Sequence, residues 1–175
     1  MRVLVTGGSA SGKSEFAEHR LLALAGQDNK YYVATMPIFN AEDEKRKAKH
    51  LRARQGRGFI TVEQPDDLTE LRLPALPGGS RRFALLEDIG NLAANEMFGK
   101  NGMTGAADRV ANGALSLAAQ CDGAVIVSVD VARDGQSYDP ETREYIRIIE
   151  SVNATLAEQF DEVYEVVCGI AIRLK

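Results

Sequence analysis

Residues 7–14 read Gly-Gly-Ser-Ala-Ser-Gly-Lys-Ser, which is a complete G-x-x-x-x-G-K-[ST] phosphate-binding motif. The motif follows the apolar run at residues 3–5 and precedes a segment with apolar side chains at helical spacing. A strand is thus followed by a tight glycine turn and then by the first turn of a helix. This order directs several backbone N–H groups and the positive end of a helix dipole at one anion. The sequence therefore predicts that the chain binds a nucleoside triphosphate.

The motif also assigns roles to its residues. Lys13 is expected to reach the β- and γ-phosphates and to assist catalysis, and the hydroxyl of Ser14 is expected to bind Mg²⁺. The residues expected to surround the triphosphate are Gly7, Gly8, Ser9, Ala10, Ser11, Gly12, Lys13 and Ser14.

Strand and helix patterns alternate along the chain. Apolar or β-rich runs that predict strands lie at residues 3–6, 31–35, 59–62, 83–86, 124–127, 163–167 and 169–174. Helical patterns follow the phosphate loop as far as Gly26 and occupy residues 104–121 and about 141–160. This alternation favours an α/β fold of the P-loop nucleoside triphosphatase type, with a mainly parallel sheet and helices on both faces. We expect residues 1–175 to form a single domain of this kind.

Composition narrows the class of protein. A formal net charge of −4 argues against nucleic acid as a partner, and no apolar stretch is long enough to span a membrane. The short apolar start runs directly into the phosphate loop and does not resemble a signal peptide. Cys121 and Cys168 lack C-x-x-C spacing, so we expect two reduced, buried thiols in a cytoplasmic protein and no zinc site.

The strand expected at residues 83–86 ends in Glu87 and Asp88. Because parallel strands end at the same edge as the phosphate loop, an acid here can hold a Mg²⁺-bound water or orient a nucleophile. We expect Glu87 to face the ligand and to bind metal, whereas the alternative role for Asp88 is to cap the next helix. Asp130, after the strand at 124–127, is a weaker candidate of the same kind.

A charged segment at residues 41–55 carries Arg46, His50 and Arg54 at intervals of four residues. On a helix these side chains fall within about 80° of arc and share one face. Two flanking cations keep the imidazole neutral, so that a ring nitrogen can attack an α-phosphorus while the arginines hold phosphate oxygens. The alternative is an ordinary solvated helix. His19, in the first helix, is expected to be a packed or exposed residue without a role.

Several stretches together resemble one family, the bifunctional adenosylcobinamide kinase / adenosylcobinamide-phosphate guanylyltransferases. Residues 3–18 resemble the family's opening, residues 32–35 its Y-I-A-T, and residues 61–63 its T-x-E. The Arg46, His50 and Arg54 spacing is similar to its R-I-x-x-H-x-x-x-R segment, and residues 85–88 are similar to its L-L-E-C. Further similar positions are Asn95, Pro140, Arg143, Asn153, 156–157, 161–163, Gly169 and Ile170.

The resemblance implies two reactions of cobalamin biosynthesis. In the first, ATP or GTP phosphorylates the hydroxyl of the aminopropanol arm of the corrinoid adenosylcobinamide. In the second, GTP transfers GMP to that phosphate through a covalent histidine–GMP, which gives adenosylcobinamide-GDP and pyrophosphate. By resemblance His50 is the nucleophile, Ala34, Thr35 and Arg54 contact the nucleotide, and Glu63 and Glu87 line the same site. The resemblance also implies a homotrimer with sites between subunits.

The chain departs from the family pattern at two places on the acceptor side. Arg54-Gln55 replaces Arg-Pro, with one extra residue before T-x-E and Phe59 in place of tryptophan, and residues 129–132 replace N-E-V-G before a longer loop. Two alternative functions stay open at this point. One is a P-loop kinase of another small hydroxyl substrate without guanylyltransferase activity, and the other is a nucleotide-dependent regulatory protein. A switch GTPase is disfavoured because N-K-x-D is missing.

Overall fold

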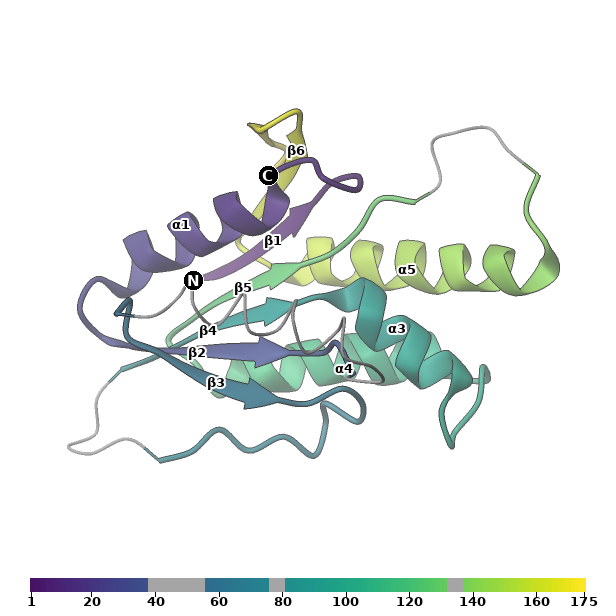
Figure 1. The fold of residues 1–175 in the computed structure, drawn as a ribbon, viewed down its shortest axis with the longest axis horizontal. Helices are drawn as coiled ribbons and strands as arrows, with labels where there is room; N and C mark the ends of the chain where they lie inside the picture. Colours follow the sequence, from purple (N-terminus) through teal and green to yellow (C-terminus); the bar gives the residue numbers. More distant parts are fainter. Residues whose placement is uncertain (38–55, 76–80, 132–136) are drawn as a thin grey trace.

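The computed structural model describes residues 1–37, 56–75, 81–131 and 137–175 (Figure 1). The strands and helices that the sequence predicts are present in these parts of the chain, together with one further helix, α3 Ile89–Phe98. The elements are β1 Arg2–Thr6, α1 Lys13–Ala25, β2 Asn29–Ala34, β3 Phe59–Glu63, β4 Arg82–Glu87, α3 Ile89–Phe98, α4 Ala106–Ala119, β5 Gly123–Val127, α5 Pro140–Gln159, β6 Glu162–Val167 and β7 Ile170–Arg173.

The described strands form one seven-stranded sheet in the order β3-β2-β4-β5-β1-β6-β7. Every neighbouring pair is parallel except the β6–β7 hairpin. Because β1 lies between β5 and β6, the loop that follows it opens at the carboxyl edge of the central strands. Ligands of open α/β sheets bind at this edge. The predicted mainly parallel sheet is confirmed.

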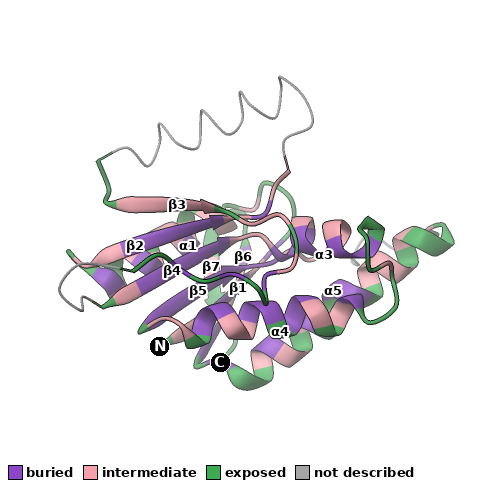
Figure 2. Ribbon diagram, turned by 90° about the horizontal axis from the view of Figure 1, so that it is seen from below, coloured by how far each residue is buried: buried purple, intermediate pink, exposed green. Residues whose placement is uncertain are grey.

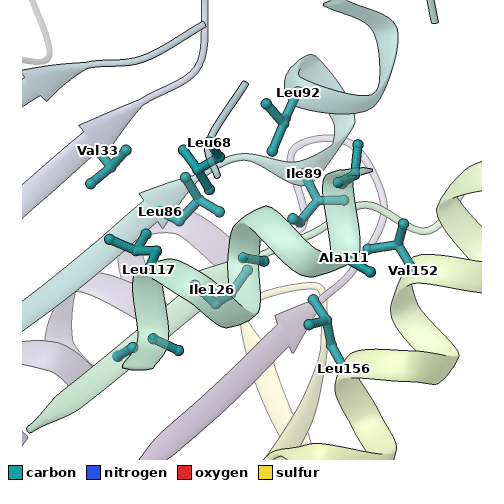
Figure 3. Close-up of a cluster of buried hydrophobic side chains, with 14 of the residues drawn as sticks. Val33, Leu68, Leu86, Ile89, Leu92, Ala111, Leu117, Ile126, Val152 and Leu156 are labelled. Atoms are coloured by element: carbon teal, nitrogen blue, oxygen red, sulfur yellow. The ribbon is translucent and has the colours of Figure 1, made fainter. Parts of the chain in front are cut away.

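Helices cover both faces of the sheet, as expected. On one face α1 buries Ala17, Leu21 and Ala25 against alternate residues of the central strands. On the other face α4 and α5 lie side by side (Figure 2) and pack with α3 on the second core. Figure 3 shows this core, where Leu86 and Ile126 of the sheet meet Leu117 of α4. The central strands are therefore buried on both faces, which explains their continuous apolar runs.

Helix ends are fixed by a few turn and cap residues. Gly12, at φ 92°, adopts a left-handed conformation immediately before α1, and Gly26 ends that helix. Asp139 caps α5 through the amide of Thr142, with Pro140 at the first helical position. The predicted helix at residues 104–121 is shorter by two residues at each end, because the chain turns at Gly105 (φ 72°) before α4 begins.

The two predicted C-terminal strands are present and pair as a hairpin, with its turn at Cys168 and Gly169. The expectation that both thiols are buried is wrong for Cys168, which is exposed because it occupies this turn at φ 50°. Cys121 is half-buried, and burial raises the pKa of its thiol to about 12. None of the helices in the described ranges has the length and apolar character needed to cross a bilayer.

Candidate functional site

The phosphate loop leaves β1 and closes back on itself before α1. The amide of Ser11 donates to the carbonyl of Gly8 at 3.3 Å, and the amide of Phe16 donates to Gly12 at 3.1 Å. A side chain at Gly7 would bring its Cβ within 2.5 Å of the Val166 carbonyl oxygen, so only glycine fits there. The tight turn over α1 predicted from the motif is therefore confirmed, and it leaves the helix N-terminus open to an anion.

Two polar side chains of the loop are suited to phosphate. The amine of Lys13 lies across the loop and donates to the carbonyl of Gly8 at 3.2 Å. The hydroxyl of Ser11 is buried and has no hydrogen-bond partner among the described residues. Since buried hydroxyls in folded proteins are nearly always paired, this one fits a ligand oxygen inside the loop. The loop thus carries one cation and one hydroxyl that has no partner among the described residues.

Ser14, at the start of α1, donates a hydrogen bond to the carboxylate of Glu87 at the end of β4. The pair is half-buried and joins the phosphate loop to the acid that the sequence singled out. Both groups offer hard oxygen ligands, which suit Mg²⁺. The described residues contain no group of three or more His, Cys, Asp or Glu that could hold a metal. Mg²⁺ fits this limited set, because it usually binds one or two protein oxygens together with water and substrate phosphates.

Asp88 caps helix α3, which is the alternative role that the sequence suggests for it. Its carboxylate accepts from the amide of Asn91 at 2.7 Å at the start of α3. Burial raises the pKa of Asp88, against the opposing effects of the Asn91 amide and the positive charge of Lys13. Asp88 therefore anchors α3 directly behind Glu87.

The register of the sheet aligns three predicted site residues. Ala34, the last residue of β2, is paired with Glu63 of β3 on one side and with Glu87 of β4 on the other. All three lie at the carboxyl edge. Glu63 is exposed there, whereas Ala34 and Glu87 are half-buried. Pairing thus brings together residues from three separate strands of the chain.

Thr35 is fully buried and holds this edge together. Its hydroxyl donates to the carbonyl of Asp88 and accepts from the amide of Asp88, both at 2.8 Å. The side-chain amide of Asn95 donates to the carbonyls of Thr35 and Pro65, at 2.8 and 2.7 Å. Asn95 stood out only through the family resemblance, because a polar residue inside a helix carries no signal for contacts with two distant loops.

Some of the remaining site residues predicted from the sequence lie within the described parts of the chain, and others do not. Arg46, His50 and Arg54 lie outside the described residues, so their predicted roles stay predictions. His19 is exposed on α1. Asp130 lies beside the phosphate loop, where its amide donates to the carbonyl of Gly7 at 3.1 Å.

A cavity of about 400 Å³ opens between α3 and α5, lined by Ala94, Phe98, Asp139, Glu141, Thr142 and Tyr145. The hydroxyl of Tyr145 donates to the carbonyl of Gly90 at 3.2 Å. Burial, helped by the charge of Asp88, raises the pKa of this hydroxyl to about 12. Tyr145 therefore connects this cavity to the first turn of α3.

Comparison of the fold with solved structures finds P-loop ATPases. One solved ATPase domain is similar with a TM-score of 0.52 and 12% sequence identity, over 94% of this chain and 68% of that one. A KaiC-like protein from the hyperthermophilic archaeon Pyrococcus horikoshii OT3 is similar with a TM-score of 0.53 and 12% identity, over 94% and 69%. At such low identity these likenesses show the fold alone, and they confirm the predicted fold class.

Comparison of the sequence reaches further. The bifunctional adenosylcobalamin biosynthesis protein CobU of Escherichia coli (strain K12) is 33% identical over 190 residues, which covers the whole of both chains. The model of the cobinamide kinase / cobinamide phosphate guanyltransferase family matches residues 3–174. Since both matches run from the first strand to the last, this chain belongs to the cobinamide kinase / cobinamide phosphate guanyltransferase family and is a transferase of cobalamin biosynthesis.

Proposed function

We propose that this chain phosphorylates the aminopropanol hydroxyl of adenosylcobinamide with ATP or GTP and then converts the phosphate to adenosylcobinamide-GDP with GTP, using His50 as the nucleophile. The observation that carries the proposal is the hydrogen bond between Ser14 and Glu87 beside the phosphate loop. This hydrogen bond supports the proposal because it holds the carboxylate of Glu87 close to the point where a bound γ-phosphate would meet its acceptor.

In the phosphorylation step the loop amides would bind the β- and γ-phosphates, and Lys13 would neutralise charge on the oxygens between them. Ser14 and Glu87 would hold Mg²⁺, which supplies further neutralisation of the phosphate charge when bound. The acceptor hydroxyl would attack the γ-phosphorus and lose its proton to water. The bond between the γ-phosphorus and the bridging oxygen would break, and the nucleoside diphosphate would leave. Thr35 and Asn95 would keep Glu87 in place through their contacts around Asp88.

In the transfer step a ring nitrogen of His50 would attack the α-phosphorus of GTP. An N–P bond forms, the bond to the β-phosphate oxygen breaks, and pyrophosphate leaves. An oxygen of adenosylcobinamide phosphate would then attack the same phosphorus and release the imidazole. Arg46 and Arg54, one helical turn away on either side in the sequence, would pair with phosphate oxygens. Ala34, Glu63 and Arg54 would contact the nucleotide at the aligned edge of the sheet.

The proposed homotrimer has support from β7, the outermost strand of the sheet. Ile170, Ile172 and Leu174 alternate along this end of the chain and are 68%, 47% and 60% exposed. A row of exposed apolar side chains on an edge strand is typical of a surface that another subunit covers. Light scattering of the wild type would give the mass of a trimer. An Ile170→Lys, Ile172→Lys variant is expected to shift toward monomer, and a wild-type monomer at working concentration would contradict the proposal.

Labelling with α-³²P-GTP tests the nucleophile. The wild-type protein should acquire a label that resists base and is lost in acid, as expected of an N–P bond to histidine. His50→Ala should not be labelled but should still phosphorylate the corrinoid hydroxyl. His19→Ala, which changes the other histidine of the chain, should behave as the wild type. Persistent label in His50→Ala would overturn the assignment, and absence of label with intact phosphorylation in the wild type would point to a kinase without guanylyltransferase activity.

A further inference from the structure

We propose that the purine nucleoside of the triphosphate used for phosphorylation lies in a cavity between the phosphate loop and the β6–β7 turn. The cavity has a volume of about 340 Å³, within the range of small-molecule sites. Its walls are residues 8–11 of the loop, Asp130, and residues 165–168 of the hairpin. The inference deepens the proposed triphosphate binding and depends on it.

The two ends of the loop site determine on which side the nucleoside lies. Ser14 and Glu87 mark the end where the γ-phosphate meets its acceptor, because the hydroxyl of this motif accompanies the β- and γ-phosphates. The α-phosphate and the nucleoside must then extend away from β4. On that side the chain offers this cavity, whose wall is made of the same loop residues that surround the phosphates.

The hairpin turn is firmly docked on the loop, so the cavity is a built feature. The amide of Gly169 donates to the carbonyl of Ser11 at 2.8 Å. A Cβ added at Gly12 would lie 3.2 Å from the Cα of Gly169, which shows how closely the two backbones approach. The turn residue Cys168 adopts φ 50° and is exposed at the cavity wall.

The lining suits a purine nucleoside in its chemistry. Val167 is 44% exposed and, with Cys168, offers a soft apolar surface for a flat base. Asp130 and Glu165 bring carboxylate oxygens, which can accept hydrogen bonds from ribose hydroxyls or from amino groups of a purine. The buried Ser11 hydroxyl, without a partner among the described residues, belongs to the same loop. A few polar groups on an apolar wall are typical of nucleotide sites.

Modification of Cys168 by N-ethylmaleimide tests the proposal directly. Cys168 is exposed, whereas the thiol of Cys121 is half-buried with a pKa of about 12, so Cys168 should react first. Saturating ATP or GTP should slow the modification of Cys168, measured by mass spectrometry, by about tenfold, since bound ligand blocks access. Tripolyphosphate, which fills the loop but has no base, should not slow it. A Cys168→Ser variant identifies the labelled site.

Equilibrium dialysis of labelled nucleotide in the same samples distinguishes failure of the proposed nucleoside cavity from failure of triphosphate binding itself. Nucleotide that binds without protecting Cys168, or tripolyphosphate that protects equally well, would overturn the nucleoside cavity and leave phosphate binding intact. Absence of any binding, tripolyphosphate included, would instead overturn the triphosphate site itself and the inference with it.

A substitution in the wall gives an independent readout. Val167→Glu places a larger, charged side chain in the cavity and should weaken ATP binding by at least about tenfold. Binding of tripolyphosphate should stay unchanged. Met103→Glu, a similarly exposed apolar residue remote from the loop, is the matched control and should bind both as the wild type does. Equal weakening of ATP and tripolyphosphate by Val167→Glu, or no weakening of ATP, would contradict the proposal.

Discussion

The hydroxyl of Ser14 donates to the carboxylate of Glu87, although the two residues are 73 positions apart in the chain. The contact forms because Ser14 lies in the first turn of the helix after β1, and Glu87 is the last residue of β4. Strands β1 and β4 belong to the same sheet. Parallel strands deliver their carboxyl ends to one edge, so a loop residue and a strand-end acid meet there. The pair couples triphosphate binding to the acid on which phosphoryl transfer would depend.

If Ser14 and Glu87 act as one unit, their substitutions should not be additive. We expect Ser14→Ala and Glu87→Gln each to lower the rate of phosphorylation by about 10- to 100-fold. Each should also lower the affinity of the protein for Mg²⁺ by about 10- to 100-fold. The double variant should be little worse than the worse single variant, because each change removes the same interaction. Steady-state rates across a Mg²⁺ titration measure this. Fully additive losses would show that the two residues act independently.

Lys13→Ala should remove triphosphate-dependent activity without unfolding the protein. The amine of Lys13 contacts the backbone of its own loop, so its loss should change the free energy of unfolding by no more than about 0.5 kcal/mol. Activity should fall by about a hundredfold or more, because a fixed cation next to the phosphates is lost. Lys100→Ala, which removes an exposed lysine after α3, is the control. Wild-type turnover in Lys13→Ala would refute its role at the phosphates.

The fold was largely predictable because its signals are local. The phosphate motif identified the β1–loop–α1 unit, and continuous apolar runs identified the central strands, which are buried on both faces. Helix α3 was not placed, because it is short and mixes small, apolar and polar residues within ten positions. The exposure of Cys168 was also missed, since a non-glycine residue at positive φ in a turn leaves no clear trace in the sequence.

The site was only partly predictable, because much of it depends on strand pairing. Glu87 could be identified from its place after a buried strand, and the loop residues from their motif. The alignment of Ala34 with Glu63 and Glu87 follows from the register of three strands, which a single sequence does not specify. The same is true of Thr35 and Asn95, whose contacts join positions 60 apart.

Two substitutions of Asp88 distinguish its role as the cap of α3 from the effect of its carboxylate charge on stability. Asp88→Ala should lower the free energy of unfolding by about 1 kcal/mol, because α3 loses the side chain that accepts from Asn91. Asp88→Asn should be much milder, since asparagine also caps helices and carries no buried charge. Urea unfolding at neutral pH measures both. Equal destabilisation by alanine and asparagine would show that the carboxylate charge, and not the cap, is what α3 requires.

We expect the contribution of Glu162 to the free energy of unfolding to be lost in acid. It is buried where α1, β6 and β7 meet, and it accepts from Arg20 at 2.7 and 3.1 Å and from Tyr164 at 3.2 Å. Burial alone would raise the pKa of Glu162, but the hydrogen bonds and charge of Arg20, with the charge of Arg173, hold it below its usual value.

A carboxylate whose pKa is lower in the folded state stabilises the fold fully above its unfolded pKa, about 4.3, and loses that contribution as the pH falls through the folded pKa. Glu162→Gln removes the titrating group. The difference in free energy of unfolding between wild type and Glu162→Gln should therefore be constant from about pH 7 to about pH 5 and should shrink below about pH 4.3. Urea unfolding at a series of pH values measures it. A difference that stays constant down to about pH 3 would show that Glu162 titrates alike in the folded and unfolded chain, and that Arg20 does not stabilise its charge.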